Sequence, residues 1–93
     1  MKKSVGTANK DVRFDLTVEP GCRVYVAGTF NNWDPTANPM KDNPGSGHCK
    51  VTLRLKPGRY EYKFIVNGEW RIDPNCTDWA PNDQSTLNSV ITV

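Results

Sequence analysis

The feature that most constrains this fold is an Asn67-Gly68 turn that follows a run of β-branched and aromatic residues. Residues 59–66 read RYEYKFIV, and Asn-Gly is the dipeptide that best tolerates the positive φ angles of a type I′ hairpin turn. A Pro-Gly pair precedes this run, and an Asp-Pro pair ends the returning arm at residue 74. The sequence therefore predicts a β-hairpin with a two-residue loop.

Strand alternation gives this hairpin an inner and an outer face. With a two-residue loop, Ile65 pairs with Trp70, and Trp70 lies on the outer face beside Lys63, with the Cβ atoms of Trp70 and Lys63 roughly 7–8 Å apart. Arg71 falls on the inner face, so the returning arm is predicted to be a short edge strand that soon leaves the sheet. The inner set is strongly apolar, is expected to face a core, and consists of Tyr60, Tyr62, Phe64 and Val66.

Short alternating runs separated by Pro, Gly, Asn and Asp continue this pattern along the chain. Residues 36–48 are predicted to form a loop that Met40 anchors in the core, and residues 75–83 a second irregular loop. No stretch has a convincing helical period, and the pattern is typical of an all-β sandwich. Four further strands are predicted, at residues 12–18, 22–27, 50–56 and 88–93, and the nearly apolar run 22–27 is expected to be central.

At 93 residues the chain is long enough for one domain with a modest core. Residues 1–10 are polar and small and are predicted to form a flexible N-terminal arm, which leaves residues 11–93 as the folded module. No apolar segment has the length of a signal-peptide core or a transmembrane helix. The three cysteines have no CxxC spacing and favour reduced thiols in a cytoplasmic protein, while a Cys22–Cys49 bridge stays open.

Charge and motif content argue against several classes of function. The formal net charge is +2 with acidic and basic residues interspersed, so nucleic acid is not an expected partner. Because no segment has transmembrane length, a membrane is not an expected partner either. His48 has no carboxylate or cysteine-rich partner nearby in sequence, so no metal or cofactor is expected. Glycoside hydrolysis needs two converging carboxylates, whereas Glu61, Glu69, Asp73 and Asp78 are scattered over strand and loop, so no enzyme is expected.

The outward aromatic residues have a chemistry that suits sugars. A sugar ring has an apolar face of C–H groups and a fringe of hydroxyls, so its site combines flat aromatic platforms with hydrogen-bonding groups. In the turn after residue 28, Phe30 is assigned to the core and Trp33 to the surface, because Trp33 lies furthest along the polar turn. Trp33 and Trp70, with Lys63 and Asn88 beside them, supply the required combination.

Other interpretations of these residues remain open at this point. A tryptophan in a small β domain is often part of the core rather than a ligand platform, and a lysine on a strand is often only a solvated residue. Trp79 is expected to pack its own loop, while a lid on a core edge and a third sugar platform are the alternatives.

Several motifs together resemble one family. They run in order and read GTFNNW at 28–33, PGRYEYKF at 57–64, NGEW at 67–70 and NSVITV at 88–93. They look like the motifs of carbohydrate-binding module family 48, which includes the glycogen-binding domain of AMP-activated protein kinase β subunits and the N-terminal modules of branching and isoamylase-type enzymes. The resemblance implies an all-β, early-set immunoglobulin-like β-sandwich that binds α-1,4-linked glucans such as glycogen, starch, maltooligosaccharides and cyclodextrins.

The resemblance also implies roles for individual residues. Two tryptophans grip the glucan, a lysine hydrogen-bonds sugar hydroxyls, and an asparagine that opens the last strand contributes. Gln84 stands where kinase-subunit members carry a leucine that inserts into the glucan coil, which implies a weaker grip or another preferred chain length. A catalytic domain or subunit is a second expected partner, and the alternative function is a structural or protein-interaction module that binds no sugar. The site residues implied are Trp33, Lys63, Trp70, Gln84, Thr86 and Asn88.

Overall fold

The structure, a computed structural model, describes residues 9–42, 46–82 and 86–93 and consists of antiparallel strands. Within these residues there is no helix, and so none with the length and apolar character needed to cross a bilayer. Gln84 lies outside the described residues. The strands are β1 (Lys10–Thr17), β2 (Val24–Gly28), β3 (Pro39–Asp42), β4 (His48–Leu55), β5 (Arg59–Val66), β6 (Glu69–Arg71), β7 (Trp79–Pro81) and β8 (Leu87–Thr92).

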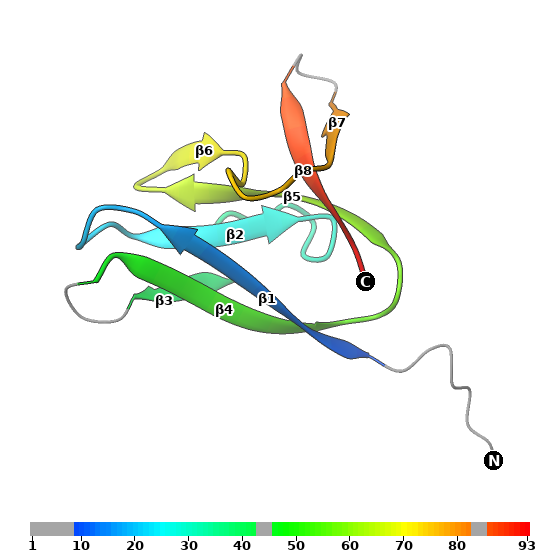
Figure 1. Ribbon diagram of the computed structural model, residues 1–93, viewed down its shortest axis with the longest axis horizontal. Helices are drawn as coiled ribbons and strands as arrows, with labels where there is room; N and C mark the ends of the chain where they lie inside the picture. The colour runs from blue at the N-terminus through cyan, green and yellow to red at the C-terminus, as the bar shows by residue number, and fades with distance from the viewer. Residues whose placement is uncertain (1–8, 43–45, 83–85) are drawn as a thin grey trace.

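The strands form one curled sheet that folds back on itself as a sandwich (Figure 1). Its order is β1-β4-β3-β2-β5-β8-β7, with β6 paired to β5. β3 makes the corner between the two halves, since Pro39 and Met40 pair with β2 whereas Lys41 and Asp42 pair with β4. The predicted all-β, immunoglobulin-like sandwich is confirmed.

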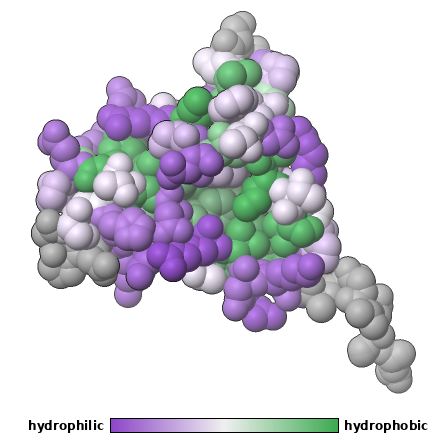
Figure 2. Space-filling view, viewed as in Figure 1, coloured by the Kyte–Doolittle hydropathy of each residue, from purple (hydrophilic) through white to green (hydrophobic). Residues whose placement is uncertain are grey.

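The core lies between the two halves of the sheet and is built from their inward residues. Phe14 of β1 contacts Tyr62 of β5 at a ring-centroid distance of 5.0 Å, and Phe30 packs against Phe14 at 5.5 Å, which confirms the assignment of Phe30 to the core. Figure 2 shows apolar surface in a hollow between β1 and β8, with polar side chains around it. β2 is buried at four of its five residues, as expected of a central strand.

The hairpin has the predicted register. Ile65 pairs with Trp70 and Phe64 with Arg71, and Asn67 and Gly68 have φ angles of 49° and 85°. Both φ values are positive, which is what the type I′ turn requires. β6 is only three residues long and fully exposed, which confirms the short edge strand.

Two short strands were not predicted from the sequence. β3 lies inside the expected loop 36–48, and β7 lies inside the expected loop 75–83, so both loop assignments are wrong over these residues. Each strand is short and contains a proline, so pairing with its neighbours imposes its conformation more than its own sequence does. The expected anchor Met40 is buried within β3, with 6% of its surface exposed.

The N-terminal boundary differs slightly from the prediction. β1 begins at Lys10, which pairs with Leu55 and so belongs to the sheet rather than to the predicted arm. Residues 1–8 of that arm lie outside the described residues.

Candidate functional site

An open groove of about 940 Å³ lies on the outer face of β5, between the β5–β6 hairpin and the β7–β8 hairpin. It carries two indole rings at one end and amide, hydroxyl, ammonium and carboxylate groups along the rest. The lining residues are Thr29, Trp33, Glu61, Lys63, Trp70, Pro81, Asn82, Thr86 and Asn88.

The two indoles come from different parts of the chain and lie side by side. The ring centroids of Trp33 and Trp70 are 6.5 Å apart, with an angle of 47° between the ring planes. Trp70 is 44% exposed and Trp33 is half-buried. Tilted rings at this spacing present a continuous, bent apolar surface to a ligand.

Hydrogen bonds within the turn hold Trp33 in place. The Trp33 amide donates to the Gly28 carbonyl at 2.9 Å, and the Asn31 side chain accepts from the Gly28 amide at 3.0 Å and donates to Asn38 at 2.6 Å. Trp33 has a φ of 58°, a left-handed conformation that is costly for a bulky side chain. At Gly28, a Cβ would collide with the Glu61 carbonyl, so glycine is required there for the turn to approach β5.

The polar groups of the groove form one connected network. The Lys63 ammonium donates to the Thr86 hydroxyl at 2.9 Å. Asn82 donates to the same hydroxyl at 2.7 Å and to Asn88 Oδ1 at 2.9 Å, and Asn88 Nδ2 donates to Glu61 Oε1 at 2.9 Å. The network therefore fixes the orientation of each group before any ligand arrives, which lowers the ordering cost of binding.

Glu61 is the negatively charged member of this network. The hydrogen bond from Asn88, followed by the hydrogen bond and charge of Arg59, holds the pKa of Glu61 below its usual value of 4.5. Arg59 Nη1 lies 2.9 Å from Glu61 Oε2. Glu61 is therefore a carboxylate at neutral pH and serves as a hydrogen-bond acceptor in the groove.

Comparison with known proteins identifies the class of this chain. Residues 11–93 match the family described as the glycogen recognition site of AMP-activated protein kinase. The chain belongs to this family. It is therefore a non-catalytic carbohydrate-binding module, and its resemblance to the glycogen-binding domains of the kinase β subunits is confirmed.

Relatives occur in kinase subunits and in plant proteins. The chain is 44% identical to Protein FLOURY ENDOSPERM 6, chloroplastic, of Oryza sativa over 59% of its length and 10% of that protein. It is 37% identical to SNF1 protein kinase subunit beta-2 of Saccharomyces cerevisiae over 67% of its length and 16% of that protein. It is 33% identical to 5'-AMP-activated protein kinase subunit beta-1 of Sus scrofa over 78% of its length and 56% of that protein. The chain thus spans from about a tenth to about half of these relatives.

The structure brings five of the six predicted site residues into the groove of this carbohydrate-binding module: Trp33, Lys63, Trp70, Thr86 and Asn88. The sixth, Gln84, falls outside the described residues. Trp79 is 48% exposed on β7 and is not among the residues that line the groove. It therefore adds no third platform at this position.

Sequence reasoning missed several polar residues of the groove. Glu61 lies two residues before Lys63, so strand alternation puts both side chains on the outer face, but in the sequence Glu61 was considered only as a catalytic carboxylate. Asn82 and Pro81 were missed because they depend on β7, which the sequence did not predict. Thr29 lines the groove because its amide donates to the Glu61 carbonyl at 2.9 Å, a contact between distant segments.

The arrangement of the carboxylates does not suit glycoside hydrolysis. Among the described residues that line the groove, Glu61 is the one carboxylate. Glu69 is paired with Arg71 at 2.7 Å, and Asp73 accepts a 2.7 Å hydrogen bond from the Tyr62 hydroxyl. A hydrolytic pair of carboxyl groups would have to face one sugar bond from two sides, and these residues do not.

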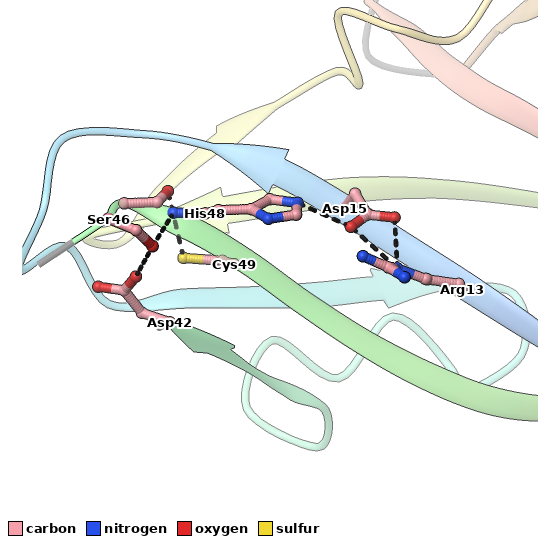
Figure 3. A network of polar contacts seen from close by, with 7 residues as sticks. Arg13, Asp15, Asp42, Ser46, His48 and Cys49 are labelled. Carbon is pink, nitrogen blue, oxygen red and sulfur yellow. Dashed lines mark hydrogen bonds and ion pairs between the residues drawn. The ribbon is translucent and has the colours of Figure 1, made fainter. Parts of the chain in front are cut away.

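Among the described residues, the histidine and the cysteines form neither a metal site nor a disulfide. His48 Nε2 lies 2.9 Å from Asp15 Oδ1 on the outer face of β1 and β4, where Arg13 bonds the same carboxylate (Figure 3). The described residues contain no group of three ligands suited to a metal ion. The thiols of Cys22, Cys49 and Cys76 are free, so the Cys22–Cys49 bridge is absent.

Proposed function

We propose that the groove binds α-1,4-linked glucans, such as glycogen, starch, maltooligosaccharides and cyclodextrins. The observation that carries this proposal is the pairing of Trp33 and Trp70 at 6.5 Å beside the polar network of Lys63, Thr86 and Asn88. The bent apolar surface suits the C–H faces of successive glucose units, because an α-1,4 chain curves whereas a β-1,4 chain is nearly flat. The donors and acceptors then meet the hydroxyls at the edge of the same sugar.

Family membership supports the same ligand. The family is described as a glycogen recognition site, and the names of the kinase-subunit relatives agree with that description. Covering one face of an indole with sugar removes roughly 100 Å² from water, worth about 2–3 kcal/mol before the cost of association. Two such faces give weak binding to a short oligosaccharide, and several modules on one polymer would strengthen it.

An alternative function is a structural or protein-interaction module that associates with a catalytic domain or partner subunit without binding sugar. The relatives named as kinase subunits favour it, because this module spans only part of each. In that case Trp33 and Trp70 would meet a protein surface instead of a sugar. An experiment can distinguish the two functions, because only the glucan-binding function requires the isolated module to bind an oligosaccharide.

The test is calorimetric titration of the module with maltoheptaose and β-cyclodextrin, with cellohexaose as the β-linked control. Saturable binding of both α-linked ligands, in the micromolar to low-millimolar range, is expected, with no binding of cellohexaose. Absence of binding at several millimolar of either α-linked ligand, by protein whose circular dichroism shows a folded sandwich, would instead support the protein-interaction module.

A further inference from the structure

Glu61 lines the groove but was not among the residues expected to bind sugar. It stands on β5 two residues before Lys63, so the two side chains share the outer face of the strand. Its side chain is 25% exposed, which leaves part of it accessible from the groove. Its backbone is fixed as well, because its amide donates to the Thr29 hydroxyl at 3.2 Å.

The hydrogen bonds that the Glu61 carboxylate accepts leave some of its acceptor sites unused. Oε1 accepts from Asn88 and Oε2 accepts from Arg59, each at 2.9 Å. A carboxylate has about four lone-pair sites, so each oxygen retains one for a further donor. The carboxylate is held on two sides and still has acceptor capacity for a ligand.

The charge of Glu61 and that of Lys63 complement each other. The charged groups that face Glu61 are Arg59 and Lys63 on its own strand, whereas Asn88 of β8 and Thr29 after β2 are neutral. Lys63 offers only donors and Glu61 only acceptors, so together they match a sugar hydroxyl pair, in which each group both donates and accepts. The hydrogen bonds from Asn88 and Arg59 keep the pKa of Glu61 low, so this complement persists into mildly acidic solution.

We propose that Glu61 is a further sugar-binding residue of the groove. Its carboxylate accepts hydrogen bonds from hydroxyls of a glucose unit while it holds the amide of Asn88 toward the same unit. This inference rests on the proposed glucan-binding function. It adds Glu61 to the groove as a hydrogen-bond acceptor for the sugar, beside Lys63 as a hydrogen-bond donor.

The experiment compares wild type with Glu61→Gln and Glu69→Gln. Glu61→Gln keeps the shape of the side chain and removes its charge. Glu69→Gln is the matched control, because Glu69 is also paired with an arginine two residues away on a strand but lies outside the groove lining. Each protein is titrated with maltoheptaose from pH 7 down to pH 3.5, and circular dichroism at each pH identifies the range in which it is folded.

The expected result at pH 7 is a loss of affinity of roughly five- to twenty-fold for Glu61→Gln, with no change for Glu69→Gln. As the pH falls below 4.5, the wild type should lose affinity toward the level of Glu61→Gln, whose own affinity stays constant. Equal affinities of Glu61→Gln and wild type at pH 7 would overturn the inference, as would an equal loss in Glu69→Gln. A wild type that binds no maltoheptaose at pH 7 would instead overturn the proposed function, so the two failures are distinguishable.

Discussion

The two outer faces of the sandwich carry similar charged residues and differ in what those residues contact. On the face of β1 and β4, Asp11 pairs with Arg54 at 3.2 Å, and Asp15 pairs with Arg13 and His48. Figure 3 shows the side chains of Arg13 and His48 directed at Asp15. None of the large exposed apolar residues among the described ranges lies on β1, β3 or β4.

On the face of β5, the charged residues lie beside indoles instead. Lys63 contacts the neutral Thr86, and Glu61 contacts the neutral Asn88 in addition to Arg59. Thr86 and Asn88 line the same groove as Trp70. Paired charges without flat apolar surface beside them offer no platform for a sugar ring. The outer face of β5 differs by having flat apolar surface next to oriented donors and acceptors.

Trp70→Ala gives the largest expected effect. It removes one platform and the contact with Trp33, so affinity for maltoheptaose should fall by about 2–3 kcal/mol. Trp79→Ala is the matched control, because Trp79 is similarly exposed and lies outside the groove. Fluorescence or calorimetric titration of both variants makes the comparison. An equal loss in the two variants would mean that the groove is not the site.

Lys63→Met gives the next largest expected effect. Methionine keeps the apolar stem and removes the ammonium, so the hydrogen bond to Thr86 and any bond to a sugar are lost. Affinity should fall by about 1–2 kcal/mol in calorimetry. Lys50→Met, on the exposed face of β4, should leave affinity unchanged. A larger loss in Lys50→Met than in Lys63→Met would contradict the difference between the two faces.

Asp15→Asn gives the smallest expected effect, on stability and not on binding. Burial acts to raise the pKa of Asp15, but hydrogen bonds and charges from Arg13 and His48 outweigh it, so the pKa lies below its usual value of 3.8. A lowered pKa means that the carboxylate stabilises the fold above the unfolded-state pKa and that this contribution is lost as the pH falls through the folded-state value.

The wild type should therefore be more stable than Asp15→Asn by up to about 1 kcal/mol at pH 6, since the pair is partly exposed. The difference should disappear as the pH falls below 3.8, the usual pKa of this carboxyl. Urea unfolding across this range measures it, with maltoheptaose titration in parallel. A difference that grows with acidity, or a change in glucan affinity, would contradict the assignment of Asp15 to a purely structural network.

The sequence predicted the hairpin and its face assignments because the signals there are local. Asn67 and Gly68 define the turn, and strand alternation then places Trp70 and Lys63 on one face. Trp33 could be assigned to the surface from its place in the polar turn, but its contact with Trp70 could not be deduced, because it joins segments that are distant in sequence. Local periodicity carries no information about such contacts.

The missed elements have a common physical cause. β3 and β7 are short and contain prolines, and pairing with longer strands imposes their conformation. The site residues that depend on them, such as Asn82, were missed for the same reason. The cytoplasmic location favoured by the reduced cysteines stays a prediction.

The most direct test of the glucan site is a nuclear magnetic resonance titration of the wild-type module with maltoheptaose. The chain has three tryptophans, so three indole N–H resonances report separately on the two groove positions and on β7. We expect saturable shifts of the Trp33 and Trp70 indole signals, with the Trp79 signal unchanged. The assignment of the glucan site to the groove would be contradicted if the Trp79 indole signal shifted on binding while the Trp33 and Trp70 signals did not.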